Sequence, residues 1–329
     1  MKKFMMCVLS IIVVVSSVLP TCAQPQPSAK IIEWKVLSAW AQGYVHRENY
    51  AVPFINLVNE RAKGELVLRI TGGPESWPMN DQVAAVRDNV FQAGGSVGAY
   101  TTNYVVEGQA LQFISAPMDK VRDSGLWDLA QKAFAKQNIR LIGAILPGTP
   151  FLTFTKKPVR KLTDFRGLIM REPSGFFSAF GASCVNTAVP EIYTALQQGV
   201  IDGLSFPVDA FVQMKWYEQT KYIIFPGFGD LFLILIANLD AWNVLPNHLK
   251  ELVSNAALEI EKRQTSYFRS TYEKAVQDVA NAGLEKIYLS ETEGKKFQDA
   301  FLSASFDMVL KKSPDLGPRM LKLGQELRK

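Results

Sequence analysis

The feature that most constrains the fold is a long stretch without helix-breaking residues in the C-terminal half. Residues 247–282 contain no proline and no glycine, the two residues least favourable inside a helix. Apolar side chains recur there at three- and four-residue steps, the spacing of one helix face. At 1.5 Å per residue the helix would be about 50 Å long, more than the diameter of a small domain. We therefore expect it to run across more than one domain, with a break near residues 264–266 as the alternative.

The N-terminus has the pattern of a secretory leader. Two lysines precede an apolar run over residues 4–19, and small residues stand at positions 21 and 23. This pattern predicts a signal peptide over residues 1–23, cleaved after Ala23, and therefore a periplasmic protein. The alternatives are an uncleaved anchor and a lipoprotein cleavage that leaves a lipid on Cys22. No second apolar run of about 18 residues follows, so we expect no further spanning helix.

Composition excludes disorder and several kinds of cofactor site. Apolar residues make up 48% of the 329-residue chain, enough to build a core in one large or two ordinary domains. The chain has 2 His, and of its 3 Cys only Cys184 follows the leader. These counts exclude a His-rich metal site, a zinc ribbon and an intrachain disulfide in the mature chain. The net charge of +5 is spread along the chain and does not indicate a nucleic-acid partner.

Strand and helix patterns alternate along the mature chain. Strands are predicted over residues 31–37, 65–70, 96–100, 139–146, 152–155, 168–171, 200–205 and 231–238. Helices are predicted over residues 46–62 (kinked or starting late because of Pro53), from a cap at Asn80 to near Gly94, and over residues 126–137 and 190–199. This rhythm implies βαβ units on mostly parallel sheets, with helices on the faces.

Signals for an enzyme are weak. Residues 94–98 match the G-x-S-x-G pattern of a nucleophile elbow around Ser96, but that pattern needs a strand before the serine and a helix after it. Here a helix is predicted before the serine and a strand around it, and His248 is the only downstream histidine. No metal-ligand spacing and no phosphate-binding glycine motif is present, so we expect no metal and no cofactor. No carboxylate pair is marked for acid–base chemistry.

Two blocks of the second half carry a family resemblance. Residues 162–173, LTDFRGLIMREP, resemble the D-x-x-G-x-K-x-R-x-P signature of DctP-type solute receptors, the binding proteins of tripartite ATP-independent periplasmic (TRAP) transporters. Gly181-Ala182 and then residues 191–203, EIYTALQQGVIDG, are similar to the family's G-A and E-V-Y-x-A-L-Q-x-G-x-V-D-G blocks, and Pro207 closes them. The resemblance spans most of the mature chain and is most specific over these blocks.

The resemblance implies a two-domain α/β clamp like that of periplasmic binding proteins. Its sheets are mixed with helices on both faces, and a long helix crosses both domains, which agrees with the pattern at residues 247–282. The expected division is a first domain over residues 24–148 and 232–270 and a second over residues 149–231 and 271–329, with hinges near residues 146–150 and 228–231. A small organic acid would bind between the domains, and a TRAP membrane permease would take it from the closed form.

Arg171 matches the family arginine that holds the ligand carboxylate. A guanidinium stays charged when desolvated and offers two parallel donors to a carboxylate. Its alternative role is an ion pair with Glu172 or Asp164 at the end of a strand. Three further residues are weaker candidates for the ligand site, namely Ser174, which would otherwise cap a helix, and Asn103 and Asp209.

Departures from the family pattern indicate the class of acid. Family members that bind sialic acid or dicarboxylates commonly have arginine where Phe151 stands, and polar residues where this chain has Leu204, Ser205 and Phe206. Phe151 and Phe206 together with Trp40 and Tyr100 would form an apolar or aromatic wall, or would be ordinary core residues. The sequence therefore predicts a monocarboxylate with an apolar or aromatic body, such as an aromatic acid, a branched 2-oxo acid or a small 2-hydroxy acid.

Three functional hypotheses remain, of which the TRAP receptor is favoured. The second is a solute receptor of another transporter class, which would lack the pattern of Arg171, Glu191 and Asp202. The third is a secreted serine hydrolase that uses Ser96. The sequence leaves open the identity of the acid, its coupling ion, and whether the protein is a monomer or a dimer.

Overall fold

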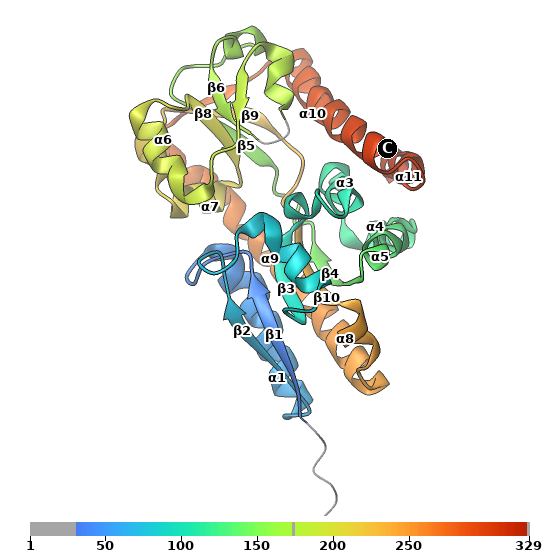
Figure 1. The fold of residues 1–329 in the computed structure, drawn as a ribbon. Helices are drawn as coiled ribbons and strands as arrows, with labels where there is room; N and C mark the ends of the chain where they lie inside the picture. The colour runs from blue at the N-terminus through green and yellow to red at the C-terminus, as the bar shows by residue number, and fades with distance from the viewer. Residues whose placement is uncertain (1–30, 173–174, 328–329) are drawn as a thin grey trace, which may run out of the picture. The chain divides into compact units, whose positions relative to one another are not determined.

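The computed structural model describes residues 31–172 and 175–327, whose strands form two β-sheets (Figure 1). The predicted leader, Cys22 and Ser174 lie outside the described residues. The first sheet has the strand order β2-β1-β3-β10-β4 and comprises β1 (Ile32–Ser38), β2 (Leu66–Gly72), β3 (Ala93–Val97), β4 (Ile139–Ile145) and β10 (Leu233–Asn238). The second has the order β11-β9-β5-β8-β6-β7 and comprises β5 (Phe151–Thr155), β6 (Ile169–Arg171), β7 (Ser183–Val185), β8 (Gly203–Phe206), β9 (Tyr222–Phe228) and β11 (Glu285–Tyr288).

Both sheets are mixed, as the family resemblance implies, so the mostly parallel sheets expected from the strand–helix rhythm are found only in part. Four of the nine strand pairings are antiparallel. The cause is that the chain passes between the sheets twice without a crossover helix. It leaves the first sheet at Ile145 and returns at Leu233, and these two residues pair. Because the returning strand enters at the end where β4 leaves, β10 must run antiparallel to β4.

Helices lie between the strands as predicted, and the structure contains several helices that the sequence patterns did not predict. The α-helices are α1 (Val52–Ala62), α2 (Gln82–Arg87), α3 (Val106–Ile114), α4 (Met118–Asp123), α5 (Leu126–Lys136), α6 (Ile192–Gln198), α7 (Val208–Gln213), α8 (Leu239–Asn243), α9 (Asn247–Asn281), α10 (Glu291–Lys312) and α11 (Gly317–Leu327). Short turns of other helix types are η1 (Arg47–Ala51), η2 (Met79–Asp81), η3 (Gly98–Thr101), η4 (Leu162–Phe165), η5 (Phe176–Phe180), η6 (Val189–Glu191) and η7 (Trp216–Gln219).

Two local predictions around α1 and α2 have different outcomes. The late start predicted from Pro53 is confirmed, because α1 begins at Val52 after the π-helical turn η1. The helix predicted from Asn80 to near Gly94 is wrong at both ends. Asp81 is the residue that precedes α2, the helix ends at Arg87, and Gly94 belongs to β3. A side chain at Gly94 would press on Val86 at 3.2 Å, so α2 packs closely on β3 at this position.

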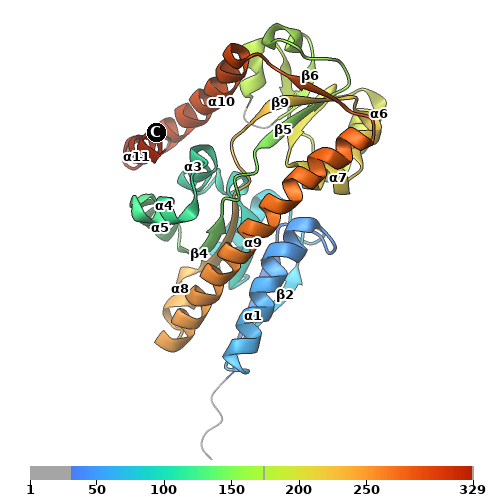
Figure 2. The same ribbon diagram turned by 180° about the vertical axis from the view of Figure 1, so that it is seen from behind.

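The long helix is confirmed as a single element of 35 residues that continues through positions 264–266. Figure 2 shows α9 running from β4 and α1 toward α7 and the second sheet. Ala256, Ala257 and Ile260 lie in the core beside the first sheet, whereas Ala275 and Val279 lie in the core beside the second. One helix thus buries its apolar face against both sheets.

The two connections between the sheets are tied together by Asp230. This carboxylate is 1% exposed and accepts hydrogen bonds from the backbone N–H groups of Gly148 at 2.8 Å and Thr149 at 2.9 Å. The Arg269 Nε of α9 donates to the backbone oxygen of Pro147 at 3.0 Å. These residues lie where the hinges are predicted. The positions of the hinges and the limits of the two domains stay predictions. The C-terminal helices α10 and α11 both pack on α3.

Asp230 generates a prediction about stability and pH. Burial raises the pKa of Asp230 to about 7 from 3.8, even though backbone N–H groups and Arg269 oppose the change. Because the folded-state pKa is the higher one, the contribution of Asp230 to stability is fully present below pH 3.8. It is lost as the pH rises toward 7. Between pH 5 and pH 8 this linkage lowers the free energy of unfolding by about 2 to 3 kcal/mol.

We expect Asp230→Asn to remove this pH dependence, as measured by urea unfolding at pH 5 and pH 8. Asp299→Asn is the control, because that carboxylate is exposed and pairs only with Lys295 of its own helix. An equal pH dependence in the wild type and Asp230→Asn would contradict the prediction.

Candidate functional site

Arg171 ends β6 with its side chain held in the interior. The residue is 9% exposed, its Nε donates to the backbone oxygen of Thr187 at 3.2 Å, and its guanidinium carbon lies 5.5 Å from the centre of the Phe206 ring. Burial lowers the pKa of Arg171, and Tyr100, Glu172 and Tyr44 oppose that change. A guanidinium remains charged under such a shift, so the site holds a desolvated positive charge.

Two tyrosines from the first sheet's side lie near this charge. Tyr44 follows β1 and Tyr100 belongs to η3, which follows β3. Burial raises the pKa of both hydroxyls, and Arg171 acts in the opposite direction on each. Asp209 also raises the pKa of Tyr44. Both hydroxyls therefore stay protonated, and Tyr44 lies within electrostatic reach of both Arg171 and Asp209.

An aromatic cluster surrounds His46 next to these groups. The ring centre of His46 lies 5.8 Å from that of Trp40, 5.3 Å from that of Tyr44 and 5.6 Å from that of Phe268, each in an edge-on arrangement. His46 Nε2 is buried and lies 3.4 Å from the Asp209 carboxylate. Residues from the first sheet's side, from α7 and from α9 thus meet at one point.

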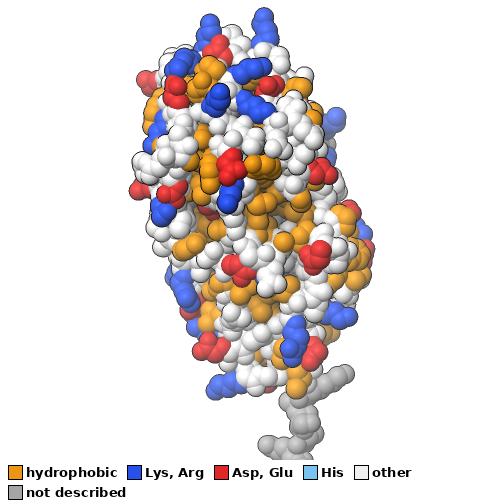
Figure 3. All heavy atoms as spheres, turned by 90° about the vertical axis from the view of Figure 1, so that its left-hand side faces the viewer, with side chains coloured by type: hydrophobic (Ala, Val, Ile, Leu, Met, Phe, Trp, Pro, Cys, Tyr) orange, Lys and Arg blue, Asp and Glu red, His pale blue; other side chains and the backbone are white. Residues whose placement is uncertain are grey.

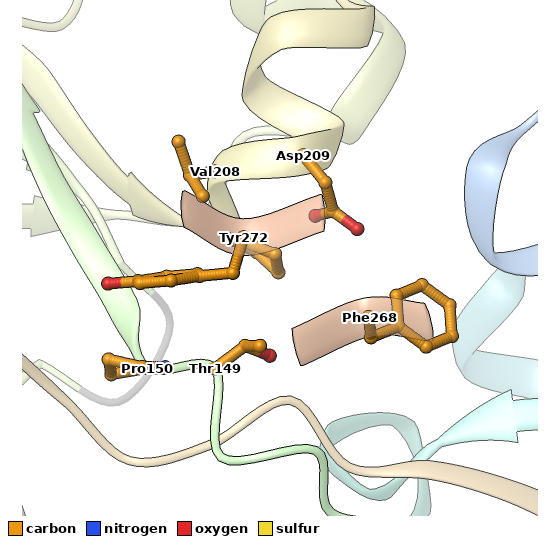
Figure 4. A pocket seen from close by; sticks show the side chains of 7 residues that line it. Thr149, Pro150, Val208, Asp209, Phe268 and Tyr272 are labelled. Carbon is orange, nitrogen blue, oxygen red and sulfur yellow. The ribbon is translucent and has the colours of Figure 1, made fainter. Parts of the chain in front are cut away.

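A pocket opens beside this cluster. Its lining residues are Thr149, Pro150, Pro207, Val208, Asp209, Phe268 and Tyr272. Figure 4 shows Asp209 on one side and Thr149 on the other, with Phe268 and Tyr272 of α9 between them. On the face drawn in Figure 3, apolar side chains gather in a band across the middle, with charged side chains above and below. The pocket has a volume of about 200 Å³, and Arg171 is not among its lining residues.

The structure brings most of the predicted site residues together. Arg171 contacts the ring of Phe206, and Tyr100 lies within electrostatic reach of Arg171. Trp40 and Asp209 both lie next to His46, and Asp209 also acts electrostatically on Tyr44.

Two predicted residues lie elsewhere. Phe151 stacks on Phe228 at 6.2 Å between ring centres and packs against the core that includes Phe176. Asn103 is exposed in the turn after η3, and within the described residues no hydrogen bond connects it to Arg171.

Sequence reasoning missed several residues of the cluster. Tyr44 lies in a loop without a motif, and His46 is one of two histidines in the chain and belongs to no recognisable motif. Phe268 and Tyr272 fit the apolar face of the long helix equally well, so the pattern carried no signal of a ligand site. Only their contacts with residues from other elements distinguish them.

The geometry around Ser96 differs from a nucleophile elbow. Ser96 is buried inside β3 rather than at a strand-to-helix turn, and its hydroxyl has no hydrogen-bond partner among the described residues. His248 contacts Glu65 at 2.8 Å at an exposed position. Over residues 31–172 and 175–327, no group of three His, Cys, Asp or Glu side chains is arranged to hold a metal ion. In the same part of the chain, no helix is long and apolar enough to cross a membrane.

Residues 37–312 match the family model DctP, described as bacterial extracellular solute-binding protein, family 7. The chain belongs to this family. It is a DctP-family TRAP solute-binding receptor for a small organic solute. Solute-binding proteins of this family are not enzymes, so the prediction of binding rather than catalysis is confirmed.

Relatives and solved structures agree with the family. A 2,3-diketo-L-gulonate-binding periplasmic protein of Escherichia coli (strain K12) is 24% identical over 84% of this chain and 87% of its own length. A monocarboxylate 2-oxoacid-binding periplasmic protein of Nostoc sp. is 24% identical over 84% of this chain and 78% of its own. A TRAP solute-binding protein of Desulfovibrio salexigens with bound orotic acid has the same fold, with a TM-score of 0.79 at 19% identity over 90% of this chain and 98% of that one.

Ser96→Ala should leave the DctP-family fold at least as stable as the wild type, because the lost hydroxyl has no partner in the described structure. The matched control is Ser205→Ala, which removes the buried 3.0 Å hydrogen bond to Thr153 and should lower the free energy of unfolding by about 1 kcal/mol. Chemical unfolding measures both. Hydrolysis of a chromogenic ester that disappears in Ser96→Ala would instead support the hydrolase hypothesis.

Proposed function

We propose that this receptor binds a small monocarboxylate with an apolar or aromatic body. The carboxylate lies on Arg171, and the site is built by residues from the sides of both sheets. The observation that carries the proposal is the buried guanidinium of Arg171 against the Phe206 ring, with the Tyr100 and Tyr44 hydroxyls beside it. A desolvated cation with hydroxyl groups around it is the environment that a carboxylate recognises.

The single guanidinium of Arg171 can compensate the charge of one ligand carboxylate. Among the described residues, Arg171 is the only positively charged group that influences the pKa of Tyr44 or Tyr100. The other neighbours are the acidic side chains of Asp209 and Glu172 and the aromatic rings of Trp40, Phe206 and Phe268. A second carboxylate or a long hydroxylated chain would lose its hydration there without gaining charged partners. An apolar or aromatic body would instead gain burial and ring contacts.

The comparisons support an acid of this kind. The Nostoc relative is described as binding monocarboxylate 2-oxoacids, and the Desulfovibrio structure holds orotic acid. The curated relatives are periplasmic proteins, and the predicted leader would direct this chain to the same compartment. We therefore propose that the protein works in the periplasm and delivers its acid to a TRAP membrane permease.

Binding would act by shifting a conformational equilibrium. Tyr44, Tyr100 and Trp40 follow strands of the first sheet, whereas Arg171 and Phe206 belong to the second. A ligand that contacts both groups stabilises the arrangement in which they are close. The permease would then recognise that closed arrangement.

Arg171→Ala should weaken binding of the acid at least tenfold and keep the fold. The expected loss reflects a desolvated carboxylate left without its partner, an effect of about 2–5 kcal/mol for buried charge pairs. Calorimetry on ligand-stripped protein measures it. Arg160→Ala is the matched control, because Arg160 is 63% exposed and pairs with Glu285 at the surface. Unchanged affinity in Arg171→Ala would remove this residue from the site.

A thermal-shift panel tests the class of acid. Phenylpyruvate, 2-oxoisocaproate, 2-hydroxyisocaproate, orotate and pyroglutamate form the test set, and succinate and N-acetylneuraminate are the comparison set. A member of the test set at about 100 times its Kd stabilises the folded state by about 2.7 kcal/mol, which raises Tm by about 4 °C for a chain of this size. A larger shift with succinate or N-acetylneuraminate would contradict the proposed class.

A further inference from the structure

The segment that carries Tyr44 is attached to α7 by one side chain. Gln213, the last residue of α7, donates from Nε2 to the backbone oxygen of Gly43 at 2.7 Å. Its Oε1 accepts from the backbone N–H of Val45 at 3.0 Å. The nitrogen and the oxygen of one side-chain amide therefore each form a hydrogen bond with one of the two residues that flank Tyr44. One helical turn earlier, Asp209 approaches His46 at 3.4 Å, as expected for positions four residues apart on one helix face.

These contacts join elements of the two sheets. Residues 43–46 follow β1 of the first sheet, whereas α7 follows β8 of the second. Tyr44 and Val45 pack partly against the core beside the first sheet and partly against the core beside the second. We call residues 43–46 together with Gln213 and Asp209 the clasp.

The segment is also braced on its own side. Glu48 accepts from the backbone N–H of Gly43 at 2.8 Å and donates its own backbone N–H to the oxygen of Tyr44 at 3.0 Å. Asn49 donates from its side chain to the oxygen of Val45 at 2.9 Å. The segment is therefore a preformed surface for Gln213, rather than a loop that must be ordered anew when it meets α7.

We propose that Gln213 is a positioning residue of the ligand site, which holds Tyr44 beside Arg171 when the two sheets' elements close on the acid. The inference rests on the proposed function in one respect, namely that Tyr44 and Arg171 are groups that face the ligand. Asp209 then has a second role in the clasp, because its carboxylate is directed at His46. Affinity falls without Gln213 because the binding-competent arrangement becomes less populated.

The first test needs no acid. Hydrogen exchange followed by mass spectrometry on the full mature chain should show amides of residues 43–49 exchanging at least fivefold faster in Gln213→Ala than in the wild type. Gln213→Glu keeps an acceptor for the Val45 N–H and loses the donor to Gly43, so its rates should lie between the two. Gln277→Ala is the matched control, because Gln277 is exposed and bonds only to Asn281 on its own helix. Equal exchange in the wild type and Gln213→Ala would overturn the clasp.

The second test measures affinity for the acid of the panel above that raises Tm most. Gln213→Ala should raise its Kd about three- to tenfold, mainly through faster dissociation, and Gln213→Glu should recover part of the loss. An unchanged Kd in Gln213→Ala together with a tenfold loss in Arg171→Ala would overturn the positioning role and leave the proposed function intact. If residues 43–49 exchange faster in Gln213→Ala but no acid of the panel binds to the wild type, the clasp is supported and the proposed class of acid is contradicted.

Discussion

The buried positive charge of Arg171 is the interaction on which the rest of the site depends. A guanidinium cannot escape the cost of burial by losing its proton, so the fold must supply compensating partners or leave room for an anion. The Thr187 oxygen satisfies Nε, and the Phe206 ring lies against the charge. Tyrosine hydroxyls stay neutral in the same environment. Glu172 partly compensates this charge, and in the proposed site the carboxylate of the acid would be a second anion beside it.

The site is shared because β6 fixes Arg171 while α9 supplies side chains to the neighbouring aromatic cluster and pocket. β6 lies between β7 and β8, so Arg171 is fixed by strands on both sides. The helix α9 supplies Phe268 to the His46 cluster and Tyr272 to the pocket, while its two ends belong to different cores. A helix that anchors both sheets can place side chains at their junction without itself being part of a mobile loop.

The sequence predicted what depends on short-range pattern. The apolar periodicity of α9 and the strand pattern that ends at Arg171 lie in contiguous residues, and both elements are confirmed by the structure. β9 was missed because Pro226 and Gly227 interrupt its strand pattern. The contact between Gln213 and Val45 joins residues 168 positions apart, and no local pattern encodes it. The contacts of Asp209 with Tyr44 and His46 were not predicted for the same reason, because Tyr44 and His46 occupy sequence positions without a motif.

The crossing segments and the pocket beside the aromatic cluster share a residue, which would couple the predicted hinge to binding at the proposed site. Thr149 lines the pocket beside Asp209, and its backbone N–H is held by Asp230. Any rotation about the crossings that strains the Asp230 hydrogen bonds therefore moves a wall of the pocket. A ligand seated against that wall resists the rotation by the same amount, because coupling between two sites is reciprocal. The clasp at Gln213 would close the opposite side of the site, so that opening requires the loss of contacts at both places.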